Sequence, residues 1–222
     1  MTSTRKKEIE QDTMRILSYY RISENPGKYL QKIVDGEEIV LIDYHDWAEE
    51  LCGRFLFIDN EPVIFYNAKH TEAMQAFTIA HELGHYFLRH LDNEDSEIIC
   101  IDRDFNRLGD DSKFEKEVEA NYFAACLLMP LNMLAPVFWE FMRRNNRNRV
   151  LYVDNQQCNY LDYKQCIRTL QLYFLASESA IRYRLVNLNW MQFNIHYDPT
   201  EDRGISIAEY LSGINKGYST QC

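Results

Sequence analysis

Two histidines four residues apart are the side chains of this sequence best suited to chemistry. They stand in the run His81-Glu-Leu-Gly-His85, inside a largely apolar segment. Side chains at positions i and i+4 share one face of a helix, so both imidazoles can hold one metal ion. Zinc in hydrolases takes three protein ligands and keeps one position open for water. Glu82 follows the first histidine, where its carboxylate can act on that water as a general base.

A second helix, predicted over about 113–129, offers three glutamates as the third zinc ligand. Glu117 shares a helix face with Asn121 and with the small residue Ala124, which favours close helix packing and a hydrogen bond to a metal ligand. Glu119 lies on a different face. We therefore predict Glu117 as the third ligand and Asn121 as a residue behind the ligands, with Glu119 as the alternative ligand.

The elements expected to position these residues form a mainly helical α+β core. Helices are predicted over 1–21, 28–34 and 44–52, the last with Asp43 as its N-cap, and the motif helix over 71–90. Strands at 54–58 and 63–66, joined by a turn, predict an antiparallel hairpin before the motif helix. The acidic segment 91–112 is interpreted as a solvated loop, with a lid or a partner surface as the alternative.

The polar Arg/Asn run at 143–149 divides the chain into a predicted core domain, 1–142, and a helical C-terminal region, 143–222. Within the second region, 160–175 and 177–188 are predicted to be two helices joined by a short turn. The tail, 192–222, is weakly patterned and supports no prediction.

Composition and charge narrow the class of protein. The chain has 222 residues and a net charge of −10, whereas a free-standing nucleic-acid binder more usually has a basic surface. Its six cysteines form no Cys-x-x-Cys pair, the N-terminus has no secretory apolar region, and no run approaches the roughly 20 apolar residues of a membrane span. We therefore expect a reduced, cytoplasmic protein without direct DNA binding or membrane contact.

Taken together, the motifs resemble the ImmA/IrrE metallopeptidases over roughly residues 38–191. The markers are Ile64-Phe-Tyr-Asn67, Phe77-Thr-Ile-Ala-His-Glu-Leu-Gly-His85, Glu117-x-x-x-Asn121-x-Phe-Ala124, Leu127-Leu-Met-Pro130 and Ser177-Glu-Ser-Ala-Ile-Arg-Tyr-Arg-Leu-Val-Asn-Leu188. The resemblance implies a zincin-like core with a small antiparallel sheet, followed by a helix-turn-helix-like region at about 160–190. It also implies that Glu117 is the third zinc ligand.

Two features depart from the family pattern. The acidic segment between the motif helix and the second helix is long, and Asn189-Trp190 stands where the family commonly has glycine and an aliphatic residue. The second departure weakens the resemblance at the end of the helix-turn-helix-like region. It therefore also weakens the case for a DNA-binding or partner-binding role of that region.

Members of the family act as anti-repressors that cleave a helix-turn-helix repressor. The resemblance therefore implies a zinc-dependent endopeptidase that hydrolyses a specific intracellular protein, a helix-turn-helix repressor encoded nearby, and so derepresses its genes. In this mechanism Glu82 accepts a proton from water and passes it to the leaving amine. The residues considered as donors to the developing oxyanion are Tyr122, Tyr86, His90 and His196, and the sequence does not choose among them.

The alternative hypothesis is a non-catalytic protein. It would be a zinc-containing transcriptional regulator, or a toxin–antitoxin partner, that acts by binding. In the regulator, Arg182 and Arg184 of the last predicted helix would face DNA phosphates. An intact general base argues against this alternative, because a purely structural zinc site has no use for one.

Overall fold

The computed structural model describes residues 1–91, 97–101, 111–147, 150–154 and 156–194. The helices are α1 (Ser3–Tyr19), the short 3₁₀ helix η1 (Pro26–Lys28), α2 (Leu30–Gly36), α3 (Glu72–Phe87), α4 (Asp111–Leu128), α5 (Leu131–Arg144), α6 (Gln157–Tyr173) and α7 (Glu178–Asn187). The strands are β1 (Val40–Tyr44), β2 (Leu51–Ile58), β3 (Glu61–Asn67), β4 (Glu97–Ile101), β5 (Leu151–Val153) and β6 (Met191–Phe193). The predicted α+β class is confirmed.

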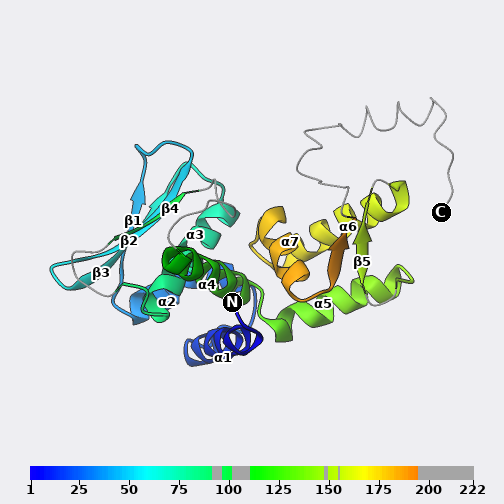
Figure 1. Ribbon diagram of the computed structural model, residues 1–222, viewed down its shortest axis with the longest axis horizontal. Helices are drawn as coiled ribbons and strands as arrows, with labels where there is room; N and C mark the ends of the chain where they lie inside the picture. Colours follow the sequence, from blue (N-terminus) through cyan, green and yellow to red (C-terminus); the bar gives the residue numbers. More distant parts are fainter. Residues whose placement is uncertain (92–96, 102–110, 148–149, 155, 195–222) are drawn as a thin grey trace.

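The main sheet has the strand order β1-β3-β2-β4 and lies at one end of the molecule (Figure 1). Strands β2 and β3 form the predicted antiparallel hairpin, turning at Asp59 and Asn60, which both have positive φ. However, β1 pairs in parallel with β3, so the sheet is mixed and the prediction of a purely antiparallel sheet is wrong. The parallel pair arises because the chain passes from β1 to β2 and only then returns as β3 between them.

The predicted helix over 44–52 is also wrong. Strand β1 ends at Tyr44, a loop follows, and β2 begins at Leu51. The side-chain amide of Asn67 donates hydrogen bonds to the carbonyls of Ala48 (3.0 Å) and Leu51 (2.8 Å), and Trp47 packs beside Tyr44 with ring centroids 5.0 Å apart. These contacts, which come partly from β3, override the local helical pattern.

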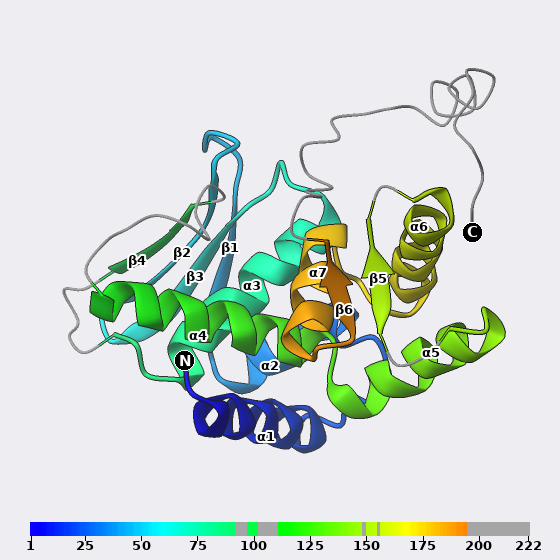
Figure 2. The same cartoon turned by 45° about the vertical axis from the view of Figure 1, so that its right-hand side comes forward.

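Helix α3 is packed between the sheet and α4 (Figure 2). It begins at the N-cap Thr71, whose hydroxyl accepts a hydrogen bond from the Met74 amide. The two helices approach closely at Gly84, where an added Cβ would lie 3.1 Å from the Cα of Ala120. This close packing brings the histidines of α3 against the first turns of α4.

The remaining elements, α5, β5, α6, α7 and β6, form a second group beside the first (Figure 1). Helices α6 and α7 confirm the two helices predicted over 160–175 and 177–188. Helix α5 and the parallel pair β5–β6 had no counterpart in the sequence analysis. One buried apolar cluster continues from α3 and α4 into α6 and α7, while the proposed division at residue 142 stays a prediction.

The acidic segment after α3 is described in part. Strand β4 pairs with β2 within it, so this part is not the irregular loop that we predicted. The rest of the segment, 92–96 and 102–110, lies outside the described residues, as does the tail from 195. Among the described helices, none is long and apolar enough by itself to cross a membrane. Within the described part of the chain, one bent pair of helices, Phe114–Leu128 and Leu131–Arg144, passes that length and composition test.

Candidate metal centre

Three predicted ligands meet between α3 and α4. His81, His85 and Glu117 each offer a ligand atom, and these atoms all lie within 4.8 Å of one another. The Nε2 atoms of the two histidines are 3.0 Å apart, and the Glu117 oxygens lie 3.3 Å from His81 Nε2 and 3.4 Å from His85 Nε2. Both histidines are buried, whereas the Glu117 side chain is 39% exposed. The site therefore opens to solvent on the side of Glu117.

Asn121 stands behind the first ligand, where the helix-face argument places it. Its Oδ1 lies 3.0 Å from His81 Nδ1. An amide oxygen only accepts hydrogen bonds, so this contact places the ring proton of His81 on Nδ1 and leaves Nε2 free to bind a metal.

Glu82 is fully buried, and neither of its carboxylate oxygens has a hydrogen-bond partner within the described part of the chain. Burial raises its pKa to about 8. Strand β2 lies directly on the carboxylate at Gly53, where an added Cβ would be 2.9 Å from Glu82 Oε1. An unpaired carboxylate beside a ligand cluster is costly in a structural core, which favours a chemical role.

Burial and neighbouring charges shift the pKa values of all three ligand side chains. Burial lowers the pKa of His85 to about 4. Burial also acts to lower the pKa of His81, but the hydrogen bond with Glu117 and the nearby carboxylates outweigh it and raise this pKa. Burial acts to raise the pKa of Glu117, but its contacts with both histidines outweigh burial and hold this pKa well below the usual range. Glu117 is thus an ionised carboxylate that faces the two histidines.

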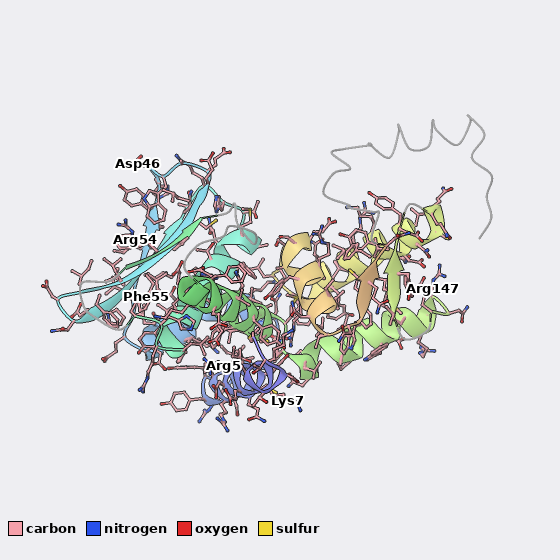
Figure 3. All side chains as sticks on the ribbon, viewed as in Figure 1. Arg5, Lys7, Asp46, Arg54, Phe55 and Arg147 are labelled. Atoms are coloured by element: carbon pink, nitrogen blue, oxygen red, sulfur yellow. The ribbon has the colours of Figure 1, made fainter. Side chains whose placement is uncertain are left out.

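A chain of side chains, which the sequence analysis missed, stands behind the second ligand. His90 Nδ1 lies 2.9 Å from His85 Nδ1, and His90 Nε2 lies 3.4 Å from Glu119 Oε2. Glu119 in turn accepts two hydrogen bonds from Arg5 of α1, which Figure 3 labels. Glu119, the alternative third ligand, is therefore placed behind the cluster and is not among the three grouped ligand atoms.

The other candidates for the oxyanion donor have different surroundings. The Tyr122 hydroxyl donates to Glu10 Oε1 (3.0 Å), and the Tyr86 hydroxyl donates to Glu37 Oε2 (3.1 Å). The structure thus engages both hydroxyls with carboxylates that are not ligands. His196 lies outside the described residues.

The two arginines of α7 are engaged within the protein. Arg184 is fully buried and pairs with Glu10 of α1, while the Arg182 guanidinium lies over the Phe193 ring, 5.5 Å from its centroid. Phosphate contact through Arg184 is therefore not available in this fold. Only its partners could have revealed this, because the sequence alone shows an arginine on a predicted helix.

Comparisons with known proteins agree with this geometry. Residues 38–186 match the model of the Peptidase M78 family, described as the IrrE N-terminal-like domain. Among solved structures, a Mycobacterium tuberculosis transcriptional regulator has a similar fold, with a TM-score of 0.52 and 13% sequence identity. That alignment covers 81% of this chain and 46% of the regulator, so the chain spans less than half of that protein. A search of curated protein sequences returned no match.

The matched segment runs from the residues just before β1 into α7 and contains every residue of the ligand cluster. It confirms the ImmA/IrrE resemblance. A family of peptidases that use a metal also fits two histidines and a carboxylate grouped beside a buried, unpaired glutamate. The chain therefore belongs to the Peptidase M78 (IrrE N-terminal-like) family of metallopeptidases.

Proposed function

We propose that this protein is a zinc-dependent endopeptidase of the cytoplasm, with His81, His85 and Glu117 as zinc ligands and Glu82 as the general base. The observation that carries the proposal is the pair of buried Glu82 oxygens, which lie beside the three ligand atoms and have no hydrogen-bond partner among the residues that the structure describes. A structural zinc site is closed by its ligands and has no use for such a group.

The spacing of the ligand atoms suits zinc. In a tetrahedral site with bonds of about 2.0–2.1 Å, two ligand atoms lie about 3.3–3.4 Å apart. Here the two Nε2 atoms lie 3.0 Å apart, Glu117 Oε2 lies 3.3 Å from His81 Nε2, and Glu117 Oε1 lies 3.4 Å from His85 Nε2. Two imidazole nitrogens and one carboxylate also form a ligand set known from catalytic zinc sites.

The side chains then divide the chemistry among them. Bound zinc supplies a Lewis acid that polarises the scissile carbonyl and acidifies water. Glu82 accepts the proton of the attacking water on a carboxylate oxygen and delivers it to the leaving amine. Asn121 holds the His81 ring in the orientation that directs Nε2 inward. A peptide substrate would approach from the side of Glu117, whose side chain is 39% exposed.

For the substrate, we propose a specific intracellular protein, namely a helix-turn-helix repressor encoded nearby. Family membership and the similar fold of a protein described as a transcriptional regulator support a link to transcription. Cleavage of the repressor would derepress its genes. The internal pairing of Arg184 favours a protein substrate over direct DNA binding.

The test compares Glu82→Gln with the wild-type protein. We expect the variant to retain zinc, measured by elemental analysis, and to cleave the repressor about 10²–10⁴-fold more slowly, because general bases contribute roughly that factor. Glu140→Gln, the same change on the exposed surface of α5, is the matched control and should leave the rate unchanged. His81→Ala should lose both zinc and cleavage.

Wild-type cleavage rates in Glu82→Gln would refute this mechanism. A different outcome would favour the non-catalytic alternative, the regulator or toxin–antitoxin partner. In that case the zinc-loaded wild-type protein binds the repressor tightly but yields no fragments, and a chelator changes only the binding.

A further inference from the structure

We propose that helix α1 is part of the metal centre, because Arg5 positions the His85 ring for metal binding through Glu119 and His90. This inference rests on the proposed zinc site, and it adds a positioning role for a helix that lies outside the matched segment 38–186. Four side chains from three parts of the chain carry it.

The first step is the orientation of the His85 ring. Its Nε2 faces the other two ligands, so this nitrogen must be free of a proton when it binds a metal. The proton then sits on Nδ1, which lies 2.9 Å from His90 Nδ1. His85 therefore donates this hydrogen bond and His90 accepts it. Without an acceptor, a buried N–H would be left unpaired in the metal-binding form.

The second step is the position of His90, which the end of α3 determines. The chain reverses at Arg89, whose φ is 55°, and the His90 amide donates to the His85 carbonyl (3.0 Å) while the Arg89 amide donates to the Tyr86 carbonyl (3.1 Å). This pair of bonds is a Schellman motif. It turns the His90 ring back over the ligand, and Lys116 Nζ donates to the His90 carbonyl (2.7 Å) from α4.

The third step fixes the proton on His90. Because its Nδ1 accepts from His85, its own proton sits on Nε2, which faces Glu119 Oε2 at 3.4 Å. Only a carboxylate or another acceptor at this position selects that tautomer. His90 is buried, so water does not compete freely for the contact.

The fourth step is the connection to α1. Arg5 Nε donates to Glu119 Oε1 (2.9 Å) and Arg5 Nη2 donates to Glu119 Oε2 (2.6 Å), a bidentate pair that fixes the carboxylate plane. The Arg5 side chain is 33% exposed and the Glu119 side chain 19%. Helix α1 packs along α4 (Figures 1 and 2), so the pair joins two elements that are already in contact. Without Arg5, the Glu119 carboxylate is free to rotate away from His90.

The experiment measures zinc affinity by competition with a chromophoric chelator, in the full-length protein and without any substrate. Residues behind metal ligands typically contribute 10–100-fold in affinity. We expect His90→Leu to weaken zinc binding by about 10–100-fold and Arg5→Ala by about tenfold. His90→Gln should recover much of the loss, because its amide oxygen can accept from His85.

The matched control is Arg15→Ala, which removes the same charge from the same helix. Arg15 is 76% exposed and pairs only with Asp12 among the described residues. It should leave zinc affinity unchanged. The absorption spectrum of the Co²⁺-substituted protein gives a second readout, since it reports ligand geometry. It should change in Arg5→Ala and not in Arg15→Ala.

A double-mutant cycle tests whether Arg5 acts through His90. If it does, Arg5→Ala adds no further loss of affinity in the His90→Leu background. The proposal is overturned if Arg5→Ala binds zinc as tightly as Arg15→Ala, or if its effect is the same in both backgrounds. Should Arg5→Ala fail to fold, Glu119→Gln, which keeps the side-chain shape, takes its place in the same cycle.

These outcomes are separable from failure of the proposed function. If Arg5→Ala weakens zinc binding as expected but the wild-type protein cleaves nothing, the peptidase proposal is refuted and the positioning role of Arg5 is retained. Loss of cleavage in Glu82→Gln together with an unchanged zinc affinity in Arg5→Ala would support the peptidase mechanism and refute the positioning role of Arg5.

Discussion

Helix α4 carries polar side chains on two buried faces, and the two clusters differ in how completely their hydrogen bonds are satisfied. On the face toward α3, Glu117 and Asn121 meet His81, while Glu82 next to them has no partner for either oxygen among the described residues. On the face toward α1 and α7, Tyr122 lies in a cluster in which charges are matched.

The matched cluster is centred on the buried Arg184. Its guanidinium donates to Glu10 Oε1 (2.5 Å) and Oε2 (2.9 Å), to the Met129 carbonyl (3.1 Å) and to Cys126 Sγ (3.2 Å). The Tyr122 hydroxyl donates to the same carboxylate (3.0 Å). Burial of Glu10 acts against ionisation, but the hydrogen bonds and charge of Arg184 outweigh it and lower the pKa of Glu10.

The difference separates stability from chemistry. Buried polar groups are nearly always paired. A cluster whose polar groups are all hydrogen-bonded to one another needs no further partner, and it stabilises the fold. A cluster with unpaired oxygens keeps bonding capacity for a metal, water or substrate. We therefore expect changes on the α7 side to alter stability without altering metal binding.

The largest expected effect on stability is that of Arg184→Met. It leaves the Glu10 carboxylate buried without its charge partner, and breaking such pairs typically costs about 3–5 kcal/mol. Urea denaturation should show this loss, while zinc affinity per folded molecule stays that of the wild type. Arg182→Met on the same helix, where the partly exposed arginine stacks on Phe193, should cost far less. A loss of zinc affinity in Arg184→Met as well would show that this cluster affects metal binding and not stability alone.

Lowering the pH should reduce the difference in unfolding free energy between the wild-type protein and Arg184→Met. Because the pKa of Glu10 is lowered in the folded protein, the stability from its ionised form is complete above the ordinary glutamate range and is lost as the pH falls through the folded value. The gap in unfolding free energy between wild type and Arg184→Met should therefore narrow as the pH is lowered from 7 toward 3. A gap that is constant with pH would mean that packing of Arg184, and not its charge, carries the stability.

The same contrast explains which features could be predicted from the sequence. The preference for Glu117 over Glu119 came from the helix face that Glu117 shares with Asn121, which is a local feature, and the family resemblance agreed with it. The pair Arg5–Glu119 joins residues 114 apart in sequence, and nothing local marks it. The chain reversal at Arg89, which turns His90 toward the ligand, also has no glycine that would mark it in the sequence.

The sheet shows the same limit. The hairpin β2–β3 was predicted because its strands are adjacent and its turn is short. The parallel pairs β1–β3 and β5–β6 were not, because their registers are set by non-local packing, and β5–β6 joins Leu151 to Met191. The Asn67 hydrogen bonds that replace the expected helix at 44–52 likewise come from another element.

A smaller effect is expected where β2 covers Glu82. In Gly53→Ala the new Cβ would lie 2.4 Å from Thr78 Cγ2 and 2.9 Å from Glu82 Oε1, so both must shift. Overpacking of this kind costs about 1–3 kcal/mol. The displaced carboxylate should also slow cleavage while zinc affinity is retained. Adding Thr78→Ala removes one clash and should recover stability but not the cleavage rate. If stability and cleavage rate both recover, the contact of the new Cβ with Glu82 has no effect on catalysis.

The smallest effect tests the turn that holds His90. Arg89 is exposed and has a φ of 55°, a left-handed conformation that costs a non-glycine residue roughly 1–2 kcal/mol. Glycine adopts it freely, so Arg89→Gly should stabilise the protein by about 1 kcal/mol, a rise measurable in the unfolding midpoint. Arg89→Ala, which keeps the strain, should give no such gain. Because the turn is retained, zinc affinity should match the wild type in both variants. A stabilised Arg89→Gly protein with weakened zinc binding would show that the strained residue itself, and not only the hydrogen bond from His85 to His90, orients the ligand.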